Sequence, residues 1–450
     1  MAAATQEQQA TIWGHPKGLV FLASTEMWER FSFYGMQALL TLYMVKQLLL
    51  PGFAEQVWGL AALRSLLGGG EPISDTDLAG LIAGFYSGLV YFTPIVGGWI
   101  ADRLLGAKRT VLIGVLLMSA GHLAMTFDQL FLVALVLLIL GSGALKGNIS
   151  AQVGTLYPPA ARSMRDRGFS IFSTGINIGA VSGPLVTGAV AAIWGWHAGF
   201  AVAAALMLVA LVTYLAGQRH FPEAPPRRAD PEAKPLTKSE KRKVWALIVV
   251  IALTMPAEIT YPMIWTIGPL WIDKYVALGN VPAPWFGSAD SFGSILAAAP
   301  LVALWAAQAR KGQEPTSVGK IAIGTGLTGI GAMILAAGSA TQTGPDTINI
   351  LWPILGYFTM GLAWMYYWPT TLSLVSRVAP PAVAATMVGG AFFSPFVAHT
   401  VAGMIGTRFD NMDPAAFWAM DGAIGLAGAV LLFALKNPIN RVIEARAEAD

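Results

Sequence analysis

The sequence predicts an all-α integral membrane protein with twelve transmembrane helices in two six-helix bundles. Composition gives the first reason, because 55% of the 450 residues are hydrophobic, only 12% are charged and the mean hydropathy is +0.60. About a quarter of the residues of a soluble domain are charged, so this chain has too little polar surface to stay in water. The other two reasons are a series of long apolar stretches and a polar, proline-rich break between two sets of them.

Twelve stretches approach the roughly 20 mostly apolar residues that a helix needs to cross the hydrocarbon core. The expected spans are residues 18–46, 78–101, 108–126, 129–148, 169–192, 198–216, 244–271, 284–309, 318–338, 347–376, 383–406 and 415–435. Six lie on each side of residues 217–243, whose prolines and charges predict a solvated linker. The expected division is an N-terminal bundle at 1–216, a cytoplasmic linker at 217–243 and a C-terminal bundle at 244–450.

Lysine and arginine residues predict the orientation of the spans. Most of them fall in segments on the same side as the amino terminus, including Arg103, Arg165 and the cluster Lys241–Lys243. By the positive-inside rule this side is cytoplasmic, and so are both termini. Short loops without a targeting pattern predict a multi-pass protein of the plasma membrane, in particular a bacterial inner membrane.

Several classes of function are excluded. The chain has no cysteine, which excludes a disulfide scaffold, a thiolate metal site and a cysteine nucleophile. Its histidines show no zinc spacing, and no Gly-x-Ser-x-Gly elbow is present, so neither an enzyme nor a metal site is expected. A net charge of +3 gives no reason to expect nucleic acid as a partner. The expected partners are the lipid bilayer and a small-molecule substrate.

Charged residues inside the spans are the functional signal. Glu26, Glu29 and Arg30 lie in the first span, Lys146 in the fourth and Glu258 in the seventh. A charge at a helix centre costs roughly 2.5–3.5 kcal/mol, so such residues usually pair and serve transport or proton relay. Glu26 and Arg30 are four residues apart and share a helix face, and Lys146 is expected to neutralise the remaining negative charge. The alternative interpretation is a structural ion network between two helices.

The first-span segment also carries a resemblance. Glu26-Met-Trp-Glu29-Arg30-Phe-Ser-Phe-Tyr34-Gly35 resembles the ExxER-F-x-Y-Y-G signature of the proton-coupled oligopeptide transporter (POT) family of the major facilitator superfamily. Three further stretches are similar to family signatures, namely Phe85-Tyr-Ser-Gly-Leu-Val-Tyr91 through Asp102-Arg103-Leu-Leu-Gly106-Ala-Lys108-Arg109, Gly143-Ala-Leu-Lys146-Gly-Asn148 and Gly168-Phe-Ser-Ile-Phe-Ser-Thr-Gly-Ile-Asn177-Ile-Gly179.

The resemblance implies the major facilitator fold and proton-coupled import of di- and tripeptides by alternating access. It implies a monomer that uses no cofactor, with the proton as coupling ion. Glu26, Glu29 and Arg30 would take part in proton coupling, while Arg30 and Lys146 would receive the peptide carboxylate. The other residues expected to line the cavity in this half are Tyr34, Tyr91 and Asn177.

The C-terminal half departs from the family pattern. Trp364 stands where the family carries a glutamate, five residues before Pro369, and Asp290 stands where a similar family stretch ends in asparagine. Glu258 is expected to take part in proton coupling, and Glu258 or Asp290 would then bind the substrate's ammonium beside Tyr261 and Trp364. If neither does, the substrate is a different anionic or zwitterionic solute, such as an N-capped peptide. A membrane receptor or enzyme is a further alternative that the buried acids and bases disfavour.

Glycine and proline patterns predict helix packing and kinks. Gly324-Thr-Gly326-Leu-Thr-Gly329 matches a dinucleotide fingerprint, but it lies in an apolar span and is interpreted as helix-packing surface. Two further glycine stripes, at residues 80–88 and 175–183, follow the small-xxx-small spacing that permits close helix approach. Pro256, Pro262 and Pro269 are expected to kink the seventh span.

Overall fold

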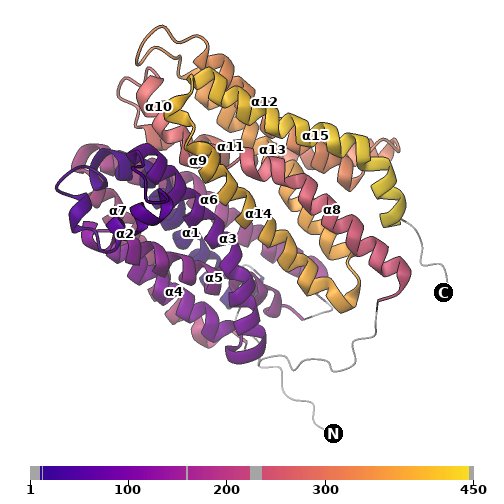
Figure 1. Ribbon diagram of the computed structural model, residues 1–450. Helices are drawn as coiled ribbons and strands as arrows, with labels where there is room; N and C mark the ends of the chain where they lie inside the picture. The colour runs from indigo at the N-terminus through magenta and orange to yellow at the C-terminus, as the bar shows by residue number, and fades with distance from the viewer. Residues whose placement is uncertain (1–10, 13, 159–160, 223–235, 445–450) are drawn as a thin grey trace. The chain divides into compact units, whose positions relative to one another are not determined.

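The computed structural model describes residues 11–12, 14–158, 161–222 and 236–444 (Figure 1). A short antiparallel hairpin of β1 (Thr11–Ile12) and β2 (His15–Pro16) precedes the helices. The α-helices are α1 (Lys17–Tyr43), α2 (Leu60–Leu67), α3 (Asp75–Ile100), α4 (Ala107–Ala124), α5 (Phe131–Thr155), α6 (Arg162–Trp194), α7 (Trp196–Gly217), α8 (Lys238–Thr260), α9 (Met263–Thr266), α10 (Gly268–Tyr275), α11 (Phe286–Arg310), α12 (Ser317–Ser339), α13 (Leu351–Val378), α14 (Ala384–Gly406) and α15 (Pro414–Glu444).

Every predicted span except the seventh falls mainly on one helix of this set. Nine helical segments of the described residues are long and apolar enough to cross a membrane. The other three predicted spans are α1, which contains Glu26, Glu29 and Arg30, α4, which begins with charged residues, and α13, which is rich in tryptophan and tyrosine. The short helix α2, between the first two spans, was not predicted.

The seventh span is not the single helix expected at 244–271. Helix α8 ends at Thr260, and the chain continues through the four-residue α9 into α10. Pro262 has no N–H to donate to the preceding turn and follows the last turn of α8, while Pro269 lies at the start of α10. Pro256 lies inside α8 without ending it.

The predicted linker ends earlier along the chain than expected, before residue 243. Helix α8 already begins at Lys238, because Thr237 and Glu240 form a capping box in which Thr237 Oγ1 accepts from the Glu240 N–H at 3.2 Å. Residues 217–222 complete α7 and a short 3₁₀ turn. The predicted linker residues 223–235 lie outside the described part of the chain.

The chain divides by its contacts into two compact units. Unit 1 comprises Met1–Leu39, Glu55–Gly59 and Thr93–Ala229, and unit 2 comprises Leu40–Ala54, Leu60–Phe92 and Asp230–Asp450. The first part of α3 belongs to unit 2 because its glycine stripe packs on α14, where a Cβ at Gly84 would lie 2.8 Å from the His399 carbonyl oxygen. The bundle boundaries at 216 and 244 therefore differ from the units and stay a prediction.

Glycines set the closest helix contacts within each unit. In unit 1, a Cβ added to Gly179 of α6 would lie 2.8 Å from the backbone nitrogen of Phe31 on α1. In unit 2, α12 and α15 run side by side (Figure 1), and a Cβ at Gly329 would lie 2.7 Å from the Gly422 carbonyl oxygen. The interpretation of residues 324–329 as packing surface is confirmed.

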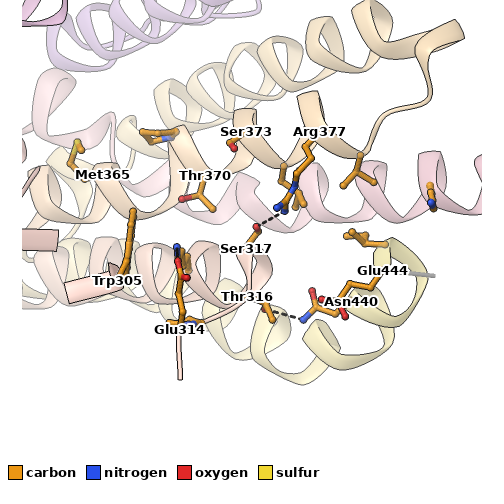
Figure 2. Close-up of a pocket in the computed structure, with 17 residues that line it drawn as sticks. Trp305, Glu314, Thr316, Ser317, Met365, Thr370, Ser373, Arg377, Asn440 and Glu444 are labelled. Carbon is orange, nitrogen blue, oxygen red and sulfur yellow. Dashed lines mark hydrogen bonds and ion pairs between the residues drawn. The ribbon is translucent and has the colours of Figure 1, made fainter. Parts of the chain in front are cut away.

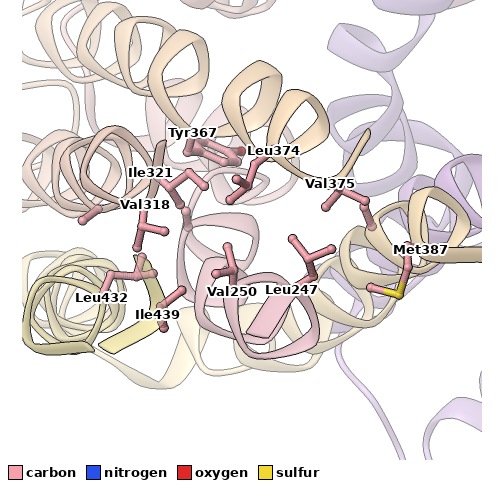
Figure 3. Packing of buried hydrophobic residues seen from close by; sticks show 13 residues of the cluster. Leu247, Val250, Val318, Ile321, Tyr367, Leu374, Val375, Met387, Leu432 and Ile439 are labelled. Carbon is pink, nitrogen blue, oxygen red and sulfur yellow. The ribbon is translucent and has the colours of Figure 1, made fainter. Parts of the chain in front are cut away.

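Unit 2 has an apolar core where α8, α12, α13, α14 and α15 meet (Figure 3). The labelled side chains are Leu247, Val250, Val318, Ile321, Tyr367, Leu374, Val375, Met387, Leu432 and Ile439. In a bilayer, lipid tails are as apolar as these side chains, so the cluster stabilises the unit through close packing rather than exclusion of water.

Candidate functional site

A buried group of opposite charges lies on α1 in unit 1. Glu29 is fully buried, and Glu26 and Arg30 are 4% and 6% exposed. The guanidinium of Arg30 binds both carboxylate oxygens of Glu29, with Nη2 to Oε1 at 2.5 Å, and its Nε also lies 3.3 Å from Glu26 Oε1. A planar guanidinium is suited to such bidentate contact, so the two acids are held around one cation.

Lys146 of α5 belongs to the same group. It interacts electrostatically with Arg30 and both glutamates, and its ammonium lies 4.6 Å from the centroid of the Phe33 ring. The Arg30 guanidinium carbon lies 5.2 Å from the same ring, so Phe33 has a cation near it from each helix. Two carboxylates and two cations balance, which is the arrangement that the sequence predicted for Lys146.

Tyr34 lies beside this group, whereas Asn177 of the neighbouring helix α6 is directed away from α1. Tyr34 follows Phe33 on α1, is partly buried and interacts electrostatically with Arg30. Asn177 of α6 is exposed. It lies midway between Gly175 and Gly179, which face α1, so the helix period directs it away from that contact.

The net charge of this group depends on whether its carboxylates are protonated. Glu26 Oε2 is buried and has no hydrogen-bond partner among the described residues. A proton added to a carboxylate of this group would leave excess positive charge on Arg30 and Lys146. An external anion could then replace the neutralised carboxylate as a partner of those cations.

The two acids that the sequence predicted for the C-terminal half, Glu258 and Asp290, are buried in unit 2. Glu258, near the end of α8, accepts a 2.5 Å hydrogen bond from Ser394 Oγ of α14. Asp290 of α11 accepts one from the Tyr261 hydroxyl at 2.7 Å, and its other oxygen has no hydrogen-bond partner within the described ranges. Tyr261 directly follows the last residue of α8, so the interruption of the seventh span lies where its hydroxyl meets Asp290.

An aromatic group lies near these acids. Tyr367 of α13 is buried and interacts electrostatically with Glu258, Asp290 and Tyr91. The Tyr91 ring of α3 lies 5.0 Å from the His399 ring and 6.1 Å from the Trp368 ring. Trp364 is partly buried and packs against the apolar core of unit 2.

The predicted residues therefore form two sets. Glu26, Glu29, Arg30, Tyr34, Lys146 and Asn177 belong to unit 1, and Tyr91, Glu258, Tyr261, Asp290 and Trp364 belong to unit 2. Their roles in binding and proton coupling stay predictions.

Two residues of interest were missed. Ser394 shows no signal in sequence, because only the packing of α14 brings it to Glu258. Asp421 of α15 is fully buried, and an acid in an apolar span is the same signal that identified Glu258. A complete scan for such acids would have found it.

A cavity of about 730 Å³ in unit 2 is lined by none of the predicted residues. It lies between α8, α11, α12, α13 and α15, at the end where α13 and α15 terminate.

Comparison with known proteins identifies relatives over nearly the whole chain. The model of the POT family matches residues 108–248 and 233–419. The di-/tripeptide transporter of Lactococcus lactis subsp. lactis (strain IL1403) is 28% identical, over 97% of this chain and 98% of that protein. The peptide transporter YePEPT of Yersinia enterocolitica is also 28% identical, over 96% of each chain.

Solved structures share the fold. A crystal structure of the peptide transporter POT in complex with sulfate superposes with a TM-score of 0.84 at 26% identity, over 97% of this chain and 98% of that one. A POT family transporter in complex with 5-aminolevulinic acid superposes with a TM-score of 0.82 at 23% identity, over 96% and 98%. The predicted twelve-helix major facilitator fold is confirmed, and the relatives are transporters rather than enzymes.

Proposed function

Because this chain belongs to the POT family, we propose that it is a proton-coupled symporter that imports di- and tripeptides by alternating access. Curated relatives that span nearly its whole length are named di-/tripeptide and peptide transporters. The observation that carries the proposal is the group of Glu26, Glu29 and Arg30, which are all buried, with Lys146 of α5 interacting with them, since burying charges is costly without a function.

In the proposed mechanism, proton and substrate compete for the same partners. The peptide carboxylate binds Arg30 and Lys146 once a proton has neutralised Glu26 or Glu29. Loss of that proton to the cytoplasm restores the ion pairs and expels the carboxylate. A competition of this kind supplies a coupling free energy on the order of 1–3 kcal/mol between the two ligands.

The substrate's ammonium requires a separate partner. Trp364 cannot form the charge-assisted hydrogen bonds of a carboxylate, and it packs on the apolar core. Of the two acids that the sequence analysis offered for this role, Glu258 and Asp290, Asp290 is the better placed, because one of its oxygens has no hydrogen-bond partner in the described part of the chain. Glu258, held by Ser394, is assigned to proton coupling.

The same proposal includes the setting in the cell. The transporter would act as a monomer in a bacterial inner membrane, with both termini in the cytoplasm. It would use no cofactor, and the proton would be the coupling ion.

The test is uptake of labelled dialanine by the purified protein in liposomes, with and without an inward proton gradient. Unlabelled dialanine and N-acetyl-dialanine serve as competitors. We expect the gradient to accelerate uptake and only the free-amine peptide to compete strongly.

Equal competition by the capped peptide would support the second candidate function, transport of an N-capped or other anionic solute. The observation favouring that candidate is Trp364 at the place of the family's glutamate. Uptake that does not respond to the proton gradient would refute proton coupling.

A further inference from the structure

The 730 Å³ cavity of unit 2 has the features of a binding site separate from the transport residues (Figure 2). Its walls come from five helices, and its polar lining includes hydroxyls of Thr316, Ser317, Thr370 and Ser373. Figure 2 shows Arg377 reaching from α13 to the start of α12 and Asn440 reaching from α15 to the same segment. The hydrogen bonds are Arg377 Nη2 to Ser317 Oγ at 3.0 Å and Asn440 Nδ2 to Thr316 Oγ1 at 2.9 Å.

The lining carries an excess of positive charge that is not neutralised locally. Lys320 is held by Glu314 at 2.5 Å and lies 3.9 Å from the Trp305 ring, so that cation already has an anionic partner. Arg377 and Lys243, by contrast, form no ion pair with a carboxylate among the described residues. Glu444 is the one remaining acid of the lining, which leaves two cations for one anion.

The helices that form the cavity also expose apolar side chains. Trp245 lies two residues after Lys243 on α8 and is 66% exposed, and α15 exposes Phe433 and Leu435 before Asn440. In a membrane-spanning chain, such residues face lipid, and tryptophan is enriched at the level of the headgroups. The cavity therefore lies at the ends of spans whose outer faces contact acyl chains.

We propose that this cavity binds a phospholipid headgroup, with the phosphate held by Arg377 and Lys243. A guanidinium binds phosphate oxygens in bidentate fashion, and the ammonium adds a second point charge. Basic pockets between transmembrane helices recognise anionic lipid headgroups in this way. The hydroxyls of Thr370 and Ser373 supply further donors, and the acyl chains lie along the apolar surface outside the cavity.

The test uses native mass spectrometry of the purified full-length protein after removal of co-purified lipid. Dioleoylphosphatidylglycerol is titrated first, then dioleoylglycerol, which lacks the phosphate, and glycerol 3-phosphate, which lacks the acyl chains. Arg377→Ala and Lys243→Ala are compared with Lys311→Ala, which removes an exposed cation three residues before Glu314 in the chain but outside the cavity lining. Both test positions lie near helix ends, so the substitutions are expected to leave the fold intact. Circular dichroism and thermal melting are used to check that each variant folds.

We expect one phosphatidylglycerol molecule to bind more tightly than any further lipid molecules. The affinity for this molecule should fall about tenfold in each cavity variant and should not change in Lys311→Ala. Equal binding of dioleoylglycerol would overturn the assignment to a phosphate. Equal binding of glycerol 3-phosphate, with the same dependence on Arg377, would replace the lipid by a free phosphorylated solute. Binding that neither cavity variant weakens would place the lipid elsewhere and overturn the site.

Discussion

Removal of the Arg30 guanidinium tests the central charge group most directly. Arg30→Lys keeps the positive charge but replaces two hydrogen bonds to Glu29 by one contact, and it cannot reproduce the fork that also reaches Glu26. Arg30→Gln removes the charge as well and leaves two buried carboxylates with Lys146 as their nearby cation. The two variants therefore separate the geometry of the site from its charge.

The magnitudes follow from the interactions that each substitution removes. One charge-assisted hydrogen bond contributes about 1.5–3 kcal/mol, so Arg30→Lys is expected to lower proton-driven uptake at low substrate concentration by about 10- to 100-fold. Breaking a buried ion pair costs about 3–5 kcal/mol, so Arg30→Gln is expected to lower it by at least about 100-fold. The assay is the initial rate of dialanine uptake in liposomes under an inward proton gradient, with reconstituted protein quantified for each variant.

Arg408→Gln is the matched control, because Arg408 is exposed outside the spans and its loss should leave uptake unchanged. Size-exclusion chromatography and thermal melting distinguish a folded, inactive variant from an unfolded one. Normal uptake by folded Arg30→Gln would refute the reasoning, since neither carboxylate binding nor proton coupling could then depend on this cation.

Three further changes, one of them with a matched control, test other parts of the structure. Tyr261→Phe removes the 2.7 Å hydrogen bond to Asp290 and should raise the KM for dialanine about fivefold. Inhibition by N-acetyl-dialanine, which has no ammonium, should not change. An equal effect on both compounds would show that Asp290 does not bind the ammonium. Gly179→Ala places a Cβ 2.8 Å from the Phe31 nitrogen and should destabilise unit 1 by about 1–3 kcal/mol, measured by thermal melting. Gly390→Ala, where nothing lies within 4 Å, should not lower the melting temperature, and equal losses in the two variants would contradict the packing argument. Thr237→Ala removes the N-cap of α8 and should weaken its first turn by about 1 kcal/mol, seen as faster hydrogen exchange of the Glu240 amide, and unchanged exchange would contradict the capping box.

The spans were predictable from the sequence because each span is marked by its own stretch of apolar residues. Two boundaries within or next to the spans were predicted wrongly. The break of the seventh span follows from Pro262 and Pro269, which predict a kink but not whether the helix ends there, and the early start of α8 follows from the Thr237–Glu240 capping box. The assignment of the first part of α3 to unit 2 depends on its contact with α14, for which the glycine spacing predicts close packing but not the partner helix.

The sequence by itself determined the membrane class, the spans and the charge group on α1, because Glu26, Glu29 and Arg30 lie within one and a half turns of a single helix. Tertiary structure alone decided which residue of another helix meets each of the buried acids, such as Ser394 for Glu258 and Tyr261 for Asp290. It also decided the cavity of unit 2, to which five separate helices contribute. The physical reason is that each residue turns a helix by about 100°, so the partner across an interface depends on the rotation and depth of both helices, which packing sets.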